Sequence, residues 1–182
     1  MMTPIVPPVN STFPNTLAEI PDIAFLRIDP SCKLKLEALG KVFYSIDKRV
    51  SKLESFINRK DGYWSIFGNP KKLLNIESRT APSFIYGTGV NEIVTLNGWD
   101  YLTVELNIPD NPEIPNNFGG VSGGGLWRTF FFTNEEKTKF MFENKNEDVA
   151  LLGISFFQLI ENDGRLIAHG PSSIYSELMK YL

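Results

Sequence analysis

The chain's clearest chemical signal is the run Phe-Gly-Gly-Val-Ser-Gly-Gly-Gly-Leu-Trp at residues 118–127. It places Ser122 in a Gly-x-Ser-Gly-Gly turn that leads directly into an apolar, strand-like segment. Glycines around a serine let two backbone N–H groups converge on one point, because no Cβ obstructs the turn. The run therefore predicts a serine nucleophile beside an oxyanion hole. The alternative is a glycine-rich β-turn that contains a serine by chance.

A second candidate for a catalytic residue is Asp22, at the start of the segment 22–28. This segment has apolar residues on both faces, which is typical of a strand inside a core. A serine that works with an aspartate also needs a histidine as its base. The chain has one histidine, His169, and it lies close to the opposite end of the sequence.

These features resemble the C-terminal two-thirds of a bacterial trypsin-like, or chymotrypsin-fold, serine peptidase, over residues 22–182. Four segments carry the resemblance, in the order that the family has them. They are the strand of the triad aspartate (22–27), the turn that opens the second barrel (67–70), the nucleophile motif (120–124) and the strand that lines the specificity pocket (152–156).

The resemblance implies an all-β fold with a complete second Greek-key barrel and a first barrel represented only by its last strand. It implies that Ser122 attacks the scissile carbonyl, that the N–H groups of Gly120 and Ser122 hold the oxyanion, and that Asp22 orients a histidine. Substrate would pair with the strand at Gly153, Ile154, Ser155 and Phe156. Val121 stands where the family has an acidic residue, so activation through a buried N-terminal ion pair is not expected.

No histidine precedes Asp22, and the 21 residues before it are too few to form the missing barrel. Two explanations stay open. The chain is a fragment of a longer peptidase, or it is a pseudo-peptidase that binds protein or peptide without cleaving it. Without its base the serine hydroxyl stays protonated, so we expect this chain alone to have no useful peptidase activity.

A further alternative is an α/β-hydrolase-type esterase in which Ser122 acts with His169 and with Asp148 or Asp163. That fold requires a helix directly after the serine. The segment 125–132 is instead aromatic and strand-like, which disfavours this alternative. We expect His169 to be a structural residue at the end of a strand.

Composition limits the other function classes. The 182 residues are 42% apolar and include 14 Gly and 12 Pro, which favours a packed, β-rich fold with many turns. The net charge of −3 and the absence of a basic cluster disfavour nucleic acid as a partner. One cysteine, Cys32, points to a reducing, cytoplasmic setting, and one Cys with one His predicts no metal site or cofactor. No run is long enough to span a membrane.

We expect an extended proline-rich arm (1–21), a remnant strand with a helix (22–60) and the barrel with a terminal helix (61–182). Apolar residues spaced by three and four predict an amphipathic helix, or two broken near Asp47, over 33–57, with Ser31 as its N-cap. The predicted surface for a protein partner or a second copy is its apolar stripe, Leu36, Leu39, Phe43, Ile46, Val50, Leu53 and Ile57. The expected strands are 63–67, 73–79, 83–88, 91–97, 100–108, 125–132, 138–142, 149–160 and 164–168. Pro171 predicts a short C-terminal helix.

Overall fold

The computed structural model describes residues 23, 28–59, 62–77, 84–106, 118–130, 132–133, 140–141, 149–159 and 165–181. Asp22 and the arm at 1–21 lie outside the described residues. The predicted aspartate strand therefore stays a prediction.

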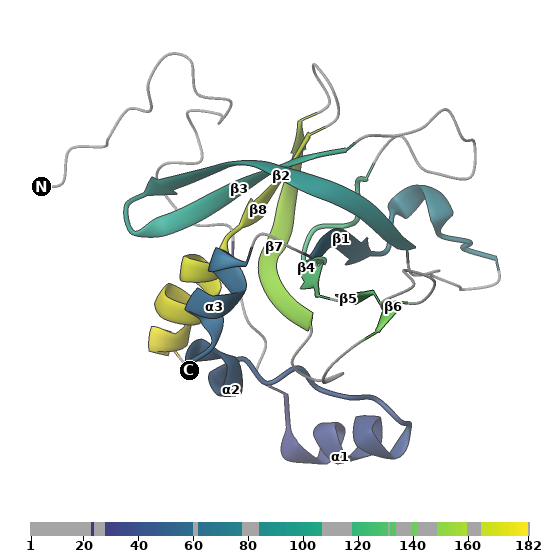
Figure 1. Cartoon of the computed structure of the whole chain (residues 1–182). Helices are drawn as coiled ribbons and strands as arrows, with labels where there is room; N and C mark the ends of the chain where they lie inside the picture. Colours follow the sequence, from purple (N-terminus) through teal and green to yellow (C-terminus); the bar gives the residue numbers. More distant parts are fainter. Residues whose placement is uncertain are drawn as a thin grey trace, which may run out of the picture.

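Six of the described strands close into an antiparallel barrel (Figure 1). They are β1 (Tyr63–Gly68), β2 (Phe84–Leu96), β3 (Trp99–Glu105), β4 (Gly125–Thr129), β7 (Val149–Leu159) and β8 (Arg165–His169). The order around the barrel is β1-β2-β3-β8-β7-β4, and β1 pairs with both β2 and β4. The strands β1, β2 and β3 are neighbours in sequence order, and β4 returns to lie beside β1 and not beside β3. This is Greek-key connectivity. Two short strands, β5 (Phe132–Thr133) and β6 (Phe140–Met141), form a separate pair.

The β-rich barrel confirms the coarse fold prediction, and the α/β-hydrolase alternative is wrong. Every strand pair among the described residues of the barrel is antiparallel, and Ser122 is followed by β4 and not by a helix. The barrel strands run from Tyr63 to His169, within the predicted range 61–182.

Alternation along the strands sorts side chains into the barrel interior or onto its outer face. The interior cluster takes residues from four strands and from the loop before β4: Ile66, Leu102, Val104, Leu126, Leu166, Ala168, Phe118 and Val121. The neighbours of these residues on β3 and β8 face outward, where Tyr101, Phe156 and Ile167 form a second buried cluster. A side chain's place in β8 therefore decides which cluster it joins.

The hairpin between β2 and β3 turns at Asn97 and Gly98, both with positive φ (53° and 85°), as expected for an Asn-Gly turn. The predicted strands 83–88 and 91–97 are wrong as separate elements. They form one strand, β2, whose pairing with β3 shifts between Val90 and Glu92, so a β-bulge replaces the expected break. The predicted strand at 73–79 is also wrong where described, because the 3-10 helix η2 (Lys71–Leu73) ends at its first residue and residues 74–77 form a loop with one isolated bridge residue, Asn75, followed by a turn.

The predicted helix over 33–57 is wrong in extent. The chain forms α1 (Pro30–Ala38), α2 (Asp47–Val50) and α3 (Leu53–Asn58). Gly40, with φ of 76°, ends α1. The Gly40 N–H donates to the Glu37 carbonyl and the Lys41 N–H donates to the Leu36 carbonyl, which is the pair of hydrogen bonds that defines a Schellman motif. The N-cap is Asp29 and not Ser31, since Asp29 Oδ1 accepts the Ser31 N–H at 2.7 Å.

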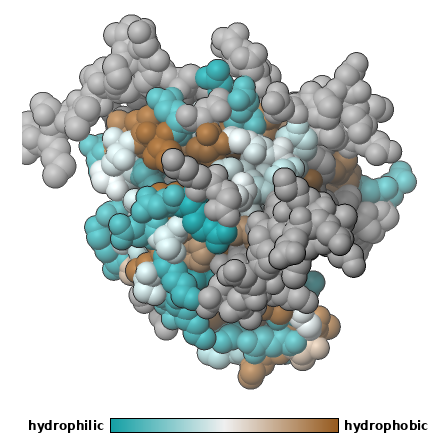
Figure 2. Space-filling model, viewed as in Figure 1, coloured by the Kyte–Doolittle hydropathy of each residue, from teal (hydrophilic) through white to brown (hydrophobic). Residues whose placement is uncertain are grey.

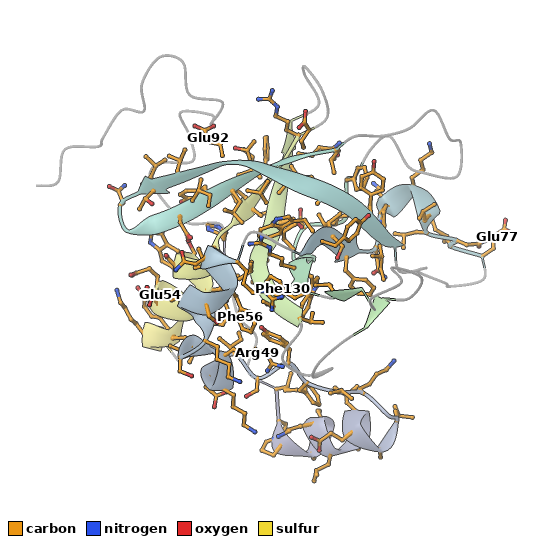
Figure 3. All side chains as sticks on the ribbon, in the orientation of Figure 1. Arg49, Glu54, Phe56, Glu77, Glu92 and Phe130 are labelled. Carbon is orange, nitrogen blue, oxygen red and sulfur yellow. The ribbon has the colours of Figure 1, made fainter. Side chains whose placement is uncertain are left out.

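Much of the predicted apolar stripe is exposed, although Leu53 packs against the cluster of Phe56 and Phe130, and its predicted role as a partner surface stays a prediction. α1 stands clear of the barrel in Figure 1, its side chains are exposed, and the lower edge of Figure 2 shows apolar patches there. Leu39 is 74% exposed and Ile57 is 42% exposed, whereas Phe56, outside the predicted stripe, is 5% exposed. Phe56 stacks on Phe130 at a ring-centroid distance of 5.6 Å (Figure 3).

The C-terminal helix is confirmed. It comprises the π-helix η3 (Ser173–Glu177) and the 3-10 helix η4 (Leu178–Tyr181). The buried Asp100 carboxylate accepts the N–H groups of Ser172 and Ser173, at 2.9 and 2.6 Å, and so caps the start of the helix. The cap fixes this helix against the beginning of β3.

Candidate functional site

Ser122 is exposed on the turn that leads into β4. The N–H of Val121 donates to the carbonyl of Phe118 at 3.0 Å, and the N–H of Gly124 donates to that of Val121 at 2.7 Å. Gly120 (φ 93°) and Gly123 (φ 82°) have the positive φ that these tight turns require. The Val121 side chain is buried in the barrel core. An apolar residue before the serine therefore anchors the loop by burial.

Ser155 of β7 holds the other side of the turn. Its carbonyl accepts the Gly123 N–H at 2.7 Å, and its own N–H donates to the Gly124 carbonyl at 2.9 Å. Its buried hydroxyl lies 2.8 Å from the carbonyl of Val121 and 3.1 Å from that of Gly124. The backbone around Ser122 is thus fixed by four polar contacts with one residue.

The Ser122 hydroxyl donates to the carbonyl of Phe156 at 3.0 Å. Phe156 is available because the pairing of β7 with β8 shifts between Ser155 and Phe157, which leaves the intervening residue out of the ladder. A hydroxyl that donates to a peptide carbonyl keeps its proton and is a weak nucleophile.

His169 does not serve Ser122. Its side chain is fully buried, with ring centroids 4.5 Å from Phe156, 5.1 Å from Tyr101 and 6.0 Å from Trp99. It ends β8, as expected of a structural histidine, and faces the outer aromatic cluster. Because Phe156 offers its ring to His169 and its carbonyl to Ser122, it lies between the two residues.

The two N–H groups that the sequence predicted as oxyanion donors have no acceptor among the described residues. Within the described part of the chain, no carbonyl or side chain accepts a hydrogen bond from the backbone N–H of Gly120 or Ser122. Both residues line the pocket described next. Free N–H groups beside a positive-φ glycine are the donors that an incoming carbonyl oxygen or anion needs.

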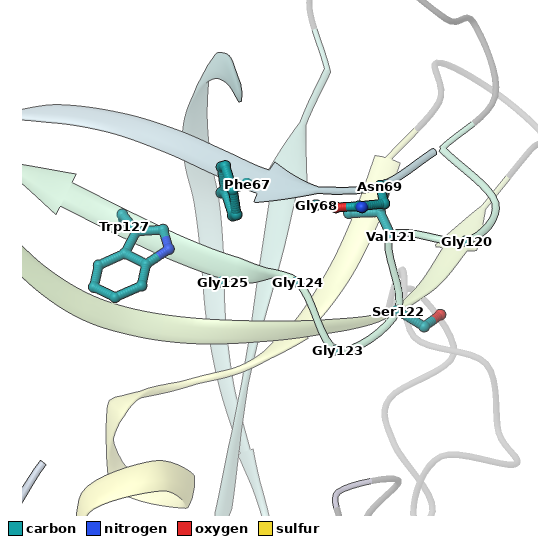
Figure 4. A pocket seen from close by; sticks show the side chains of 10 residues that line it. All are labelled: Phe67, Gly68, Asn69, Gly120, Val121, Ser122, Gly123, Gly124, Gly125 and Trp127. Carbon is teal, nitrogen blue, oxygen red and sulfur yellow. The ribbon is translucent and has the colours of Figure 1, made fainter. Parts of the chain in front are cut away.

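A pocket of about 320 Å³ opens beside the turn, between the end of β1 and the start of β4 (Figure 4). Ser122 and Trp127 lie at opposite ends of it, and Phe67 lies above its glycine backbone. Its lining residues are Phe67, Gly68, Asn69, Gly120, Val121, Ser122, Gly123, Gly124, Gly125 and Trp127, none of them charged. The structure thus brings the predicted turn at 67–70 against the serine turn, and the Lys71 N–H bonds the Gly119 carbonyl at 2.7 Å.

The predicted substrate strand does not line the pocket. Ile154 pairs with Gly125 on one side and with His169 on the other, and Gly153 is buried opposite Leu126. Ser155 is bonded to the serine turn through both its N–H and its carbonyl. Residues 153–155 are therefore already paired with other backbone, so a substrate strand cannot add to β7 at these positions. Among the described strands, none pairs with the edge of β7 beyond Ser155 on the side opposite β8.

Phe67, Asn69 and Trp127 are pocket residues that sequence reasoning did not assign to the site. The only signal for them was indirect: the resemblance placed a turn at 67–70, and Trp127 lies two residues after the glycine run. Their neighbourhood depends on the pairing of β1 with β4, which joins segments about 60 residues apart and which no local pattern encodes.

Within the described residues, no group of three or more His, Cys, Asp or Glu side chains is placed to bind a metal ion. No described helix has the length and apolar character needed to cross a membrane. Comparisons with protein-family models, with curated proteins and with solved structures found no significant match.

Proposed function

We propose that this chain is a relative of the trypsin-like serine peptidases whose serine turn binds the backbone of a peptide and does not, by itself, cleave it. The observation that carries the proposal is the pair of N–H groups without acceptors in the described part of the chain, on Gly120 and Ser122, beside an exposed serine at an uncharged pocket. The closed antiparallel barrel, entered by β4 directly after the serine, supports the same relationship.

The absence of turnover follows from the surroundings of the hydroxyl. Its described hydrogen-bond partner is the Phe156 carbonyl, which cannot accept a proton as a base does. The chain's one imidazole, His169, is buried in an aromatic cluster and does not line the pocket. Peptide binding through the two N–H groups does not need the base, because a carbonyl oxygen or carboxylate accepts from them directly.

Amide NMR of the isotope-labelled chain tests this proposal. We expect a capped alanine peptide to shift the backbone amide signals of Gly120 and Ser122, and we expect Ser122→Ala to bind it with similar affinity because the substitution keeps both N–H groups. Peptides that leave both signals in place would refute the binding role.

A fluorophosphonate probe and a peptide substrate test the second half. We expect neither labelling nor turnover by the purified chain, since both require an activated serine. Steady turnover that Ser122→Ala abolishes would show instead that the chain is an active peptidase.

A further inference from the structure

We propose that the pocket between β1 and β4 takes a bulky, uncharged side chain of the peptide held at the Ser122 turn, and that Phe67 and Trp127 select it. This inference rests on the proposed peptide-binding function and specifies the class of peptide.

The glycine at position 125 allows the Trp127 indole to form one wall of the pocket. In the antiparallel pairing of β1 with β4, Phe67 lies opposite Gly125 and Ser65 lies opposite Trp127. These residues share the outer face of the sheet, and the missing side chain at Gly125 lets the Trp127 indole lie over this glycine, beside the pocket that Phe67 and Trp127 both line. A Cβ at Gly125 would collide with the Trp127 indole and approach Leu151 Cδ1 to 3.0 Å.

The neighbouring floor is also free of side chains. A Cβ at Gly124 would collide with the carbonyls of Phe67 and Val121, so this position admits only glycine without rearrangement. Backbone at 124 and 125 therefore forms the base of the pocket, with aromatic rings beside it and above it.

The walls are positioned before any ligand arrives. The Trp127 ring meets the Tyr44 ring edge-on, with centroids 5.1 Å apart, and the indole N–H edge faces the glycine floor (Figure 4). Phe67 is 40% exposed, so its ring has surface left to cover. Rigid aromatic walls gain most from an apolar partner, because little side-chain freedom is lost when it binds.

The absence of charge in the lining excludes ionic side chains. Transfer of an unpaired carboxylate or ammonium group from water into such a site is unfavourable, whereas burial of a phenyl or leucyl side chain is favourable. The chain from Ser122 to Gly125 spans at most about 10 Å, at roughly 3.3 Å per residue. The occupant therefore belongs to a residue within about three positions of the carbonyl held at Gly120 and Ser122.

The test uses capped hexa-alanine peptides with a single Phe, Glu or Lys placed at each position in turn. Affinity is read from the amide signals of Gly120 and Ser122. We expect Phe at one position to bind about tenfold or more tightly than Ala, and Glu and Lys there to bind no better than Ala. Phe67→Ser and Gly125→Ala should each abolish the gain from Phe, the first by removing a wall and the second by displacing the Trp127 indole that lies over Gly125.

Ile93→Ser is the matched control, since Ile93 is an apolar residue of β2 that is 60% exposed and does not line the pocket. It should leave the gain from Phe unchanged. Equal affinity for all the peptides, or a gain from Phe that survives Phe67→Ser, would overturn the subsite and leave the proposed function standing. Peptides that never move the Gly120 and Ser122 signals would overturn both.

Discussion

The hydroxyls of Tyr44 and Tyr175 lie 2.9 Å apart, and together they bind the backbone N–H and the backbone carbonyl of Leu151. The Leu151 N–H donates to the Tyr44 oxygen at 3.1 Å, and the Tyr175 hydroxyl donates to the Leu151 carbonyl at 2.8 Å. Tyr44 must therefore donate its own proton to Tyr175. β8 ends opposite Ile154, so this stretch of β7 has no strand partner on that edge, and the two tyrosines supply one.

Removal of either hydroxyl should destabilise the fold. Tyr175→Phe leaves the Leu151 carbonyl without its donor and Tyr44→Phe leaves the N–H without its acceptor, each at a cost of about 1–2 kcal/mol in unfolding free energy. The double variant should lose less than the sum of the two, because the hydroxyls also bond each other. Urea unfolding measures all three free energies. Tyr181→Phe, on an exposed side chain, is the control and should be close to wild type.

The same network predicts a loss of stability in alkali. Burial, and then the hydrogen bond with Tyr44, raise the pKa of the Tyr175 hydroxyl well above its usual value of 10.0. A raised pKa in the folded state means that the contribution to stability is complete below about pH 10 and declines as the pH rises above that value. The unfolding free energy of wild type should therefore fall more steeply above pH 10 than that of Tyr175→Phe. Parallel pH curves for the two proteins would contradict this.

Two glycines of the serine turn should respond differently to alanine. Both have positive φ, which costs a residue with a Cβ about 1–2 kcal/mol. At Gly123 the new Cβ would meet nothing within 4 Å, whereas at Gly120 it would approach the Lys71 nitrogen to 2.8 Å and the Asn69 carbonyl to 3.1 Å. We expect Gly120→Ala to lower the thermal midpoint more than Gly123→Ala. The reverse order would mean that the turn at Gly120 is packed differently.

Ser155 should matter more for stability than Ser122. The buried Ser155 hydroxyl bonds the carbonyls that flank the turn, so Ser155→Ala should cost about 1–2 kcal/mol. Ser122→Ala removes an exposed hydroxyl together with its hydrogen bond to the Phe156 carbonyl, so it should cost about 0.5–1 kcal/mol, less than Ser155→Ala. Equal losses in denaturant titrations would show that Ser155 does not support the turn.

Phe56 and Ile57 provide a test of the helix register. Phe56→Ala removes a buried ring stacked on Phe130 and should cost about 3–5 kcal/mol, or prevent folding. Ile57→Ala, on a half-exposed side chain, should cost far less. Phe56→Leu keeps most of the apolar volume and remains measurable if the alanine variant does not fold. A larger loss at Ile57 than at Phe56 would restore the register that the sequence predicted.

Turns and strands could be predicted from the sequence because they depend on interactions among a few neighbouring residues. The Asn97–Gly98 turn, the barrel strands and the glycine turn at Ser122 follow from backbone freedom and from alternation of apolar side chains. The helical pattern over 33–57 failed at Gly40, because a positive-φ glycine ends a helix more decisively than apolar spacing continues it.

Other features depended on which segments meet. The pocket that Phe67 and Trp127 line, the tyrosine pair over Leu151 and the burial of His169 arise from strand pairing and register. The sequence by itself determined that a serine would stand on a glycine turn at the start of a strand. Only the tertiary structure decided what surrounds that serine, because its neighbours come from β1 and β7, whose positions depend on closure of the whole barrel.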